Sequence, residues 1–342
     1  MEFAIWNCAR GEVSMKKQKF VALLVLLAAL CAQRAPAQDR PKIFVGPSSK
    51  TLGYSPLWVG WKKGFFEQQG LDVEVLVLRG IPMVVQALAA GSIHFASGGP
   101  EPFMESSDRG LDFVITGGVI NGMTAAIVFG RKYKTFEDLR GTTIGSSSLT
   151  GGTVTALREA LRQKGLEYPK DYKILVVAGG SPGNLAAMQS GQISATTVAV
   201  PLNFAAEALG FNTLGRLLDA VPQFQSAALA VRRSWAEKNR SLMVRFNKGM
   251  VQALRWMYNN KDLTVDFLVK EIQLKPNHAL KGWEYYTQNK IWPYDGEPNM
   301  EGMKHNIRVY YEQANPKAPV PDASKFVDMS YLNEAVKELG KR

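Results

Sequence analysis

The stretch Ile144-Gly145-Ser146-Ser147-Ser148-Leu149-Thr150-Gly151-Gly152-Thr153 joins a short apolar strand pattern to an amphipathic helix pattern. Apolar residues recur at helical spacing from Val154 to Leu161, which predicts a helix over 153–164 that ends at Gly165. The turn before it offers hydroxyl groups and uncrowded backbone N–H groups at the positive end of a helix dipole, which suits a small polar or anionic ligand. The alternative is a loop that only caps its own helix. Because no lysine follows the glycines, the turn is not a nucleotide P-loop.

Short apolar stretches alternate with helical patterns on both sides of this turn. Glycine and proline separate them, and Ser55-Pro56 predicts a helix with serine as N-cap and proline at the first helical position. Strands that alternate with helices are typical of an α/β fold with a mostly parallel sheet covered on both faces. The predicted strands are 42–45, 71–78, 93–96, 112–116, 125–129, 142–145 and 227–231.

The second half of the chain repeats the first at a constant offset. Gly180-Ser181-Pro182 corresponds to Gly80-Ile81-Pro82, and Gly191-Gln192-Ile193 corresponds to Gly91-Ser92-Ile93. We therefore predict two lobes built from one β-α-β-α unit. The predicted division is an upstream segment with a signal peptide at 1–37, the first part of lobe I at 38–128, lobe II at 129–224, and a return to lobe I followed by C-terminal helices at 225–342.

Residues 15–37 have the pattern of a secretory signal peptide. A basic start precedes the apolar run 20–32, and Ala35-Pro36-Ala37 has the form of a cleavage site. The apolar run is too short to span a bilayer. A lipid anchor at Cys31 is not expected because the bulky Leu30 precedes it. The sequence thus predicts export to the periplasm.

The composition is that of a globular protein long enough for two domains. The 342 residues carry a net charge of +11, which falls to +8 once residues 1–37 are removed. This mild positive balance suits an anionic ligand, but it equally fits a soluble protein without a preference for anions. The absence of basic runs argues against a nucleic-acid partner. Cys8 and Cys31 both precede the predicted cleavage site, so no disulfide is predicted.

Patterns that indicate catalysis are weak. Gly179-Gly180-Ser181-Pro182-Gly183 has the form of a nucleophile elbow, but Pro182 lacks the backbone N–H that would complete the oxyanion hole. His94, His278 and His305 lie far apart, without the spacing of a metal site. No two carboxylates have a spacing that indicates acid–base catalysis. We therefore predict no enzymatic activity, no cofactor and no metal.

Four of the five loops at the predicted strand ends are rich in glycine, serine, threonine or asparagine. Ligands of open parallel sheets bind beyond the carboxyl ends of the strands. Two lobes that present such loops to one another form a cleft, which the connecting strands allow to close. The loops are 48–54, 97–101, 117–121, 147–153 and 198–201.

These residues resemble the periplasmic solute-binding proteins of ABC importers, in the NMT1/THI5-like group that includes nitrate, sulfonate and taurine binders. His94 stands where the group usually has aspartate. The similarity spans roughly residues 42–257. The motifs that carry it are Tyr54-Ser55-Pro56, Gly64-Phe65-Phe66-Glu67, Gly70-Leu71-Asp72-Val73-Glu74, Gly91-Ser92-Ile93-His94-Phe95-Ala96 and Phe136-Glu137-Asp138-Leu139-Arg140-Gly141.

The resemblance implies a two-lobed Venus-flytrap fold of type II with a helical C-terminal region. It implies a monomer that closes on a small solute and delivers it to an ABC permease and its ATPase at the inner membrane. By position, the ligand-binding residues would be Leu52, Gly53, Tyr54, Ser97, Gly98, Glu101 and Asn121 in one lobe, and Ser147, Ser148, Thr150, Gly151, Thr153, Val198 and Pro201 in the other.

Glu101 leaves the class of solute open. A carboxylate in the cleft repels a simple anion and suits a ligand with an amino or amidine group, such as an aminopyrimidine precursor of thiamine. If Glu101 points outward, a sulfonate, nitrate or carboxylate is easier to bind. Two further alternatives are an enzyme on the same fold, similar to the thiamine-pyrimidine synthases, and the sensor of a membrane receptor.

Overall fold

The computed structural model describes residues 40–78, 80–149, 152–314 and 316–340. The predicted signal peptide and both cysteines lie outside these residues. The sheets and helices that follow lie in the unit Lys42–Arg342. No helix in the described ranges combines the length and the apolar character needed to cross a membrane.

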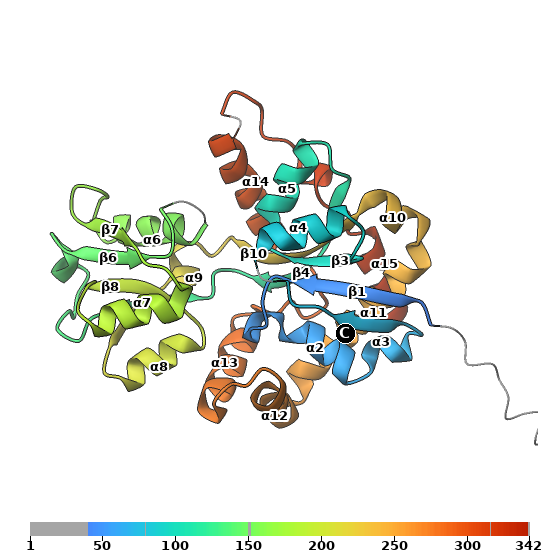
Figure 1. Ribbon diagram of the computed structural model, residues 1–342, viewed down its shortest axis with the longest axis horizontal. Coiled ribbons are helices and arrows are strands. Elements are labelled where there is room, and N and C mark those ends of the chain that lie inside the picture. Colours follow the sequence, from blue (N-terminus) through green and yellow to red (C-terminus); the bar gives the residue numbers. More distant parts are fainter. Residues whose placement is uncertain (1–39, 79, 150–151, 315, 341–342) are drawn as a thin grey trace, which may run out of the picture. The chain divides into compact units, whose positions relative to one another are not determined.

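The first sheet has five strands in the order β2-β1-β3-β10-β4 (Figure 1). β1 pairs in parallel with β2 and β3, whereas β10 runs antiparallel to both β3 and β4. The sheet is therefore mixed, with one reversed strand. The strands are β1 (Lys42–Pro47), β2 (Asp72–Val75), β3 (Phe95–Gly98), β4 (Phe113–Asn121) and β10 (Gln225–Arg232).

The second sheet repeats this arrangement in the order β7-β6-β8-β5-β9. β6 is parallel to β7 and β8, and β5 is antiparallel to β8 and β9. Equivalent backbone bonds recur one hundred residues apart, since Ser92 N donates to Ala87 O and Gln192 N donates to Ala187 O. One unit has thus been used twice, as the sequence repeat predicts. The strands are β5 (Ala125–Phe129), β6 (Thr143–Ser146), β7 (Lys173–Val176), β8 (Ala195–Ala199) and β9 (Asn212–Arg216).

Two chain segments join the sheets. Residues 122–124 lead from β4 into β5, and residues 217–224 lead from β9 through α9 (Leu217–Ala220) into β10 (Figure 1). β10 lies between β3 and β4, so the chain re-enters the first sheet in its interior. Both connections are short, and they pass close to each other because Gly122 N donates to Phe224 O at 2.7 Å.

Helices cover both faces of the first sheet, which confirms the predicted α/β class. In Figure 1, α4 and α5 lie on one face, and α2 and α3 lie on the other. The helices are α2 (Ser55–Lys62), α3 (Phe65–Gln68), α4 (Ile81–Ala89), α5 (Pro100–Asp108), α6 (Gly152–Arg162), α7 (Gly180–Gln189), α8 (Leu202–Ala208), α10 (Arg233–Lys238), α11 (Arg240–Asn259), α12 (Lys261–Glu271), α13 (Pro276–Gln288), α14 (Met300–Ala314) and α15 (Ser330–Leu339), with 3₁₀ turns η1 (Leu52–Tyr54), η2 (Glu137–Leu139) and η3 (Ala323–Lys325).

Aromatic side chains fill the core between the first sheet and α11. The ring centroid of Phe246 lies 3.7 Å from that of Phe95 and 4.8 Å from that of Phe66. All three side chains are buried, and burying a side chain of this size stabilises the fold by about 1.5–3 kcal/mol. The apolar stripe of α11 is therefore structural core.

The prediction of a loop at residues 117–121 is wrong, because these residues form the second half of β4. Gly117 and Gly118 pair with β10, and Gly118 N donates to Gly296 O at 2.8 Å. A Cβ on Gly118 would lie 2.7 Å from Pro298 Cα. The glycines that suggest a loop in the sequence instead allow another backbone segment to approach the strand closely.

The predicted cap at Ser55 is also wrong by one residue. α2 begins at Ser55, and Tyr54 takes the N-cap position without a capping side-chain bond. The preceding 3₁₀ turn η1 already brings the chain into helical conformation, so a serine cap has no role here.

Candidate functional site

A cavity of about 360 Å³, called here the smaller cavity, opens at the carboxyl ends of β6 and β8. This is the edge where a parallel sheet presents its ligands. Met123 and Thr124 of the connection into β5, together with Ser226 of β10, complete its wall. The residues that line it are Met123, Thr124, Ala125, Ser146, Ser147, Ser148, Gly152, Thr153, Val154, Gly180, Ser181, Asn184, Thr197, Ala199 and Ser226.

Two helices begin at the smaller cavity. Gly152 and Thr153 start α6, and Gly180 and Ser181 start α7. The first backbone N–H groups of a helix have no partner within it, and each helix start carries about half a positive charge. Two such starts that line one cavity create a positive potential there without any cationic side chain. The arrangement favours an anionic group.

Asn184 on α7 supplies a buried polar group to the same cavity. Its Nδ2 donates to Thr197 O at 3.4 Å and to Ser147 Oγ at 3.5 Å. Its Oδ1 is buried and has no partner among the described residues. Beside it, Ser181 Oγ accepts a hydrogen bond from Ala199 N at 3.0 Å. The base of the cavity is therefore an ordered polar surface.

No charged side chain is among the described residues of the smaller cavity. Likewise, no group of three or more His, Cys, Asp or Glu side chains within the described ranges is arranged to hold a metal ion. An anion bound here would be held by hydroxyl groups, one amide and helix-start N–H groups.

Of the residues predicted for lobe II, Ser147, Ser148 and Thr153 line the smaller cavity. Thr150 and Gly151 lie outside the described residues. Val198 is completely buried in the core of the second sheet, and Pro201 contacts α13, where a Cβ on Gly282 would lie 3.5 Å from its Cβ.

The residues predicted at η1 lie in the core of the first lobe. Leu52 is buried, and Gly53 O accepts a hydrogen bond from Trp292 Nε1 at 3.1 Å. Tyr54 Oη lies 3.0 Å from Ser48 Oγ, and burial raises the pKa of the Tyr54 hydroxyl although the bond to Ser48 opposes this. These side chains contact protein atoms, and they are not among those that line the smaller cavity.

Ser97, Gly98 and Asn121 lie at strand ends of the first sheet. Ser97 and Gly98 are buried, and Ile81 packs over Gly98, where an added Cβ would lie 2.2 Å from Ile81 Cδ1. Asn121 Nδ2 donates to Glu297 O at 3.1 Å. None of the three lines the smaller cavity as far as the structure describes it.

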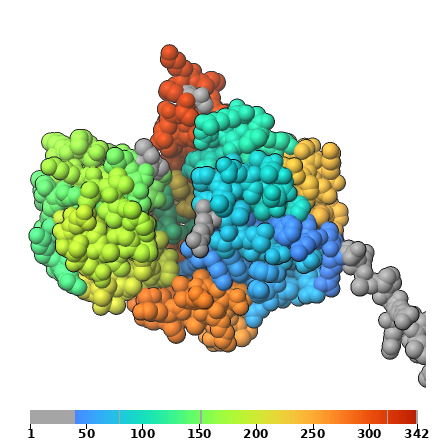
Figure 2. All heavy atoms as spheres, in the orientation of Figure 1, coloured from blue at the N-terminus to red at the C-terminus, as the bar shows by residue number. Residues whose placement is uncertain are grey.

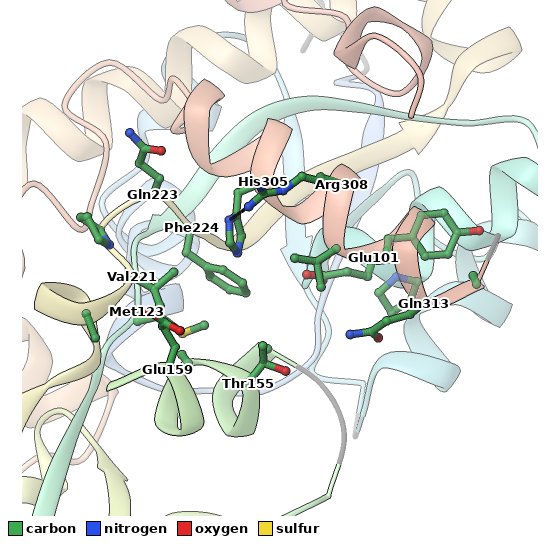
Figure 3. A pocket seen from close by; sticks show the side chains of 18 of the residues that line it. Glu101, Met123, Thr155, Glu159, Val221, Gln223, Phe224, His305, Arg308 and Gln313 are labelled. Carbon is green, nitrogen blue, oxygen red and sulfur yellow. Dashed lines mark hydrogen bonds between the residues drawn. The ribbon is translucent and has the colours of Figure 1, made fainter. Parts of the chain in front are cut away.

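Glu101 lines a second, larger cavity of about 990 Å³ (Figure 3). Its Oε1 accepts a hydrogen bond from Asn306 Nδ2 at 2.6 Å. Burial raises the pKa of this carboxyl group, and the bonds from its own backbone N–H and from Asn306 oppose the rise. In the space-filling view of Figure 2, a hollow separates the second lobe from the first lobe and α14.

His94 has a structural role. Its Nδ1 accepts a hydrogen bond from Phe44 N at 3.0 Å, and its ring lies between those of Phe44 and Trp235. Burial and the charge of Arg232 lower the pKa of His94, which keeps Nδ1 free to accept. An aspartate could accept the same N–H, so the substitution leaves this part of the fold intact.

The residues of the smaller cavity that were not predicted from the sequence include Asn184, Thr197, Thr124 and Ser226. Asparagine and threonine inside a helix or a strand carry no local signal of ligand binding. The starts of α6 and α7 lie at the same sheet edge because each helix follows one of two parallel strands, β6 and β7.

The model of the NMT1-like family matches residues 48–266, which is more than half of the chain. The chain belongs to the NMT1-like family. A relative from Brucella abortus, named provisionally as a binding protein, is 28% identical over 188 residues. The match covers 55% of this chain and 56% of that protein, so it spans about half the length of the relative.

Solved structures share the fold of this NMT1-like chain. The alkanesulfonate-binding protein SsuA of Xanthomonas axonopodis, bound to MOPS, is 17% identical with a TM-score of 0.62 over 82% of this chain and 95% of its own. The periplasmic nitrate-binding protein NrtA of Synechocystis is 17% identical with a TM-score of 0.68 over 88% and 89%. These likenesses show the predicted two-lobed periplasmic-binding-protein fold.

One of the similar structures is not named as a binding protein of a transporter. A mutant of DszB in complex with biphenyl-2-sulfinic acid is 14% identical to this NMT1-like chain, with a TM-score of 0.68 over 87% of this chain and 99% of its own. The fold by itself therefore does not separate binding from catalysis.

Proposed function

We propose that this chain is the extracytoplasmic solute-binding protein of an ABC importer. It captures a small polar or anionic organic solute, such as a sulfonate, nitrate or a carboxylate, between its two lobes. It then delivers the solute to a permease and its ATPase at the inner membrane. The periplasm is the proposed location, in line with the signal-peptide pattern at 15–37.

The observation that carries this proposal is the smaller cavity. Hydroxyl groups and two helix starts converge there, and its described lining has no charged side chain. Such a site binds an anion through hydrogen bonds that a transporter can later break, because no ion pair has to be separated. Capture between lobes is supported by the duplicated sheets and their two short connections.

The position of Glu101 favours an anionic group over an aminopyrimidine in the smaller cavity. Glu101 lines the larger cavity and accepts a hydrogen bond from Asn306. Its carboxylate is therefore not part of the described lining of the smaller cavity, where an anion would lie at the starts of α6 and α7.

A thermal-shift screen tests the proposal. The purified chain without residues 1–37 is heated with sulfonates, nitrate, aromatic carboxylates and pyrimidines. A ligand present at 100 times its dissociation constant stabilises the folded protein by about 2.7 kcal/mol. We expect a sulfonate, nitrate or a carboxylate to raise Tm, and mass spectrometry to recover it unchanged. Conversion of the ligand into another compound would contradict the proposal.

The variant Ser147→Ala, Thr153→Ala tests the site itself. Both side chains line the smaller cavity and are exposed, so their loss should leave the fold intact. Hydrogen bonds to a charged group contribute about 1.5–3 kcal/mol each, so we expect affinity to fall by at least tenfold. Ser190→Ala is the matched control, because Ser190 Oγ donates to Ala187 O at the far end of α7. Equal affinity in all three proteins would show that the site is misplaced.

A further inference from the structure

The larger cavity lies between the two lobes. It takes no part in the proposed binding of the anionic group, which occupies the smaller cavity. Figure 3 shows Thr155 and Glu159 reaching it from α6, and His305 and Arg308 reaching it from α14 on the opposite side. Its volume of about 990 Å³ is at the upper end of the range of about 300–1,000 Å³ for ligand pockets. The space is thus large enough for an organic molecule.

The larger and smaller cavities are neighbours. Two described residues, Met123 and Gly152, line both of them. A Cβ on Gly152 would lie 2.6 Å from Phe224 Cζ and 3.5 Å from Met123 Cε, so the glycine leaves room for both side chains. Methionine has three rotatable bonds and adapts readily to a new neighbour. The boundary between the cavities is therefore thin and adaptable, and one solute can extend across it.

One wall of the larger cavity is apolar. Val221 and Phe224 come from the connection into β10, Ala156 comes from α6, and Val309 comes from α14. The Phe224 ring packs edge-on against His305 at 6.1 Å between centroids. This wall is suited to an aliphatic or aromatic group.

The larger cavity also has negatively charged groups in its lining. They are the carboxylates of Glu101, Glu105 and Glu159. Glu105 and Glu159 each form an ion pair with an arginine three or four residues along the chain. Glu101 forms no ion pair with any described residue, and Asn306 Nδ2 is its hydrogen-bond donor. A half-buried carboxylate without a cation gains most from a positively charged partner.

Among the described residues that line this cavity, Arg308 is the one lysine or arginine. Its side chain is exposed, and its Nη2 lies 3.2 Å from His305 Nδ1. Solvent screens an exposed guanidinium strongly, so Glu101 determines the charge preference of the interior.

We propose that the larger cavity receives the body of the solute whose anionic group occupies the smaller cavity, with an ammonium group of that body at Glu101 and its apolar part against Phe224. The solute is then an amine-bearing organic anion, an inference that rests on the proposed function. The wall formed by α14 follows the part of the chain, 48–266, that the family model matches. Glu101 and Phe224 lie inside the matched part, and the α14 side of the larger cavity lies outside it.

Three sulfonates of increasing complexity test this inference by isothermal titration calorimetry. Methanesulfonate has only the anionic group, 3-phenylpropane-1-sulfonate adds an apolar body, and 3-(benzylammonio)propane-1-sulfonate adds an ammonium group. We expect affinity to rise in this order. Glu101→Gln keeps the acceptor for Asn306 and removes the charge, so it should weaken the third ligand by about tenfold or more and leave the other two unchanged.

A cavity-filling variant provides the second arm. Val309→Trp should weaken both larger ligands and leave methanesulfonate binding unchanged, since Val309 lines only the larger of the two cavities. Glu312→Trp is the control, because Glu312 is exposed on the same helix and lines neither. Equal affinity for all three ligands would overturn this inference and leave the proposed function standing. If none of the three ligands binds, this inference is wrong, and so is the proposal that the solute of the smaller cavity is a sulfonate.

Discussion

At the scale of single residues, His94 shows how a departure from a family pattern keeps its local function. The backbone N–H of Phe44 needs an acceptor at this position, and neutral imidazole supplies one at 3.0 Å. In the second lobe the equivalent position is Ser194, whose Oγ lies 2.7 Å from the hydroxyl of Tyr133. A polar group that binds the neighbouring segment is thus common to both copies of the repeat.

The protonation of His94 should make stability depend on pH. Burial and Arg232 lower its pKa in the folded protein. The unfolded chain then binds the proton first, so stability falls as pH drops from 6.5 through the lowered folded-state pKa. His94→Asn keeps an acceptor without titrating, and its stability should fall less over this window. Urea unfolding at about pH 7 and about pH 5.5 measures the difference across the unperturbed histidine pKa, and parallel pH profiles for the two proteins would contradict it.

At the scale of elements, β4 depends on close contact with the segment before α14. Gly118 N donates to Gly296 O at 2.8 Å, and the backbone of Pro298 lies over Gly118. The adjacent Gly117 has more room, since a Cβ there would meet Gly296 O at 3.4 Å. The two glycines look alike in sequence but differ in what surrounds them.

This difference predicts unequal costs for the same substitution. Gly118→Ala would place its Cβ 2.8 Å from Glu297 O, and overpacking against backbone should cost about 3 kcal/mol. Gly117→Ala meets only ordinary contacts, and it should change stability by less than about 1 kcal/mol because it also restricts the unfolded chain. Denaturant unfolding of both variants measures the costs. If the two variants lose similar amounts of unfolding free energy, the backbone of residues 296–298 can move away from position 118 at little cost.

At the scale of the whole molecule, two lobes of the same strand order are joined by two short connections. A solute that contacts both lobes favours the conformation in which they approach. Small-angle X-ray scattering should therefore show a smaller radius of gyration with a saturating solute from the thermal-shift screen. The Ser147→Ala, Thr153→Ala variant should keep its radius at the same solute concentration. A radius that stays constant in the parent protein although Tm rises would argue against closure.

Local sequence patterns were enough to predict the α/β class, the internal repeat and the glycine- and serine-rich turn before α6. Periodicity, and the glycines and prolines that interrupt it, act between neighbours in the chain, so they can be recognised without coordinates. Ser147, Ser148 and Thr153 were found this way because they follow a strand and precede a helix.

Which strand-end residues line a cavity became known only from the folded chain. Leu52, Gly53 and Val198 are buried by side chains distant in sequence, and Gly118 lies in a strand because it pairs with β10, which is more than one hundred residues away. Asn184 reaches the site from inside a helix. Burial and close approach depend on contacts between distant parts of the chain, and a local pattern does not record them.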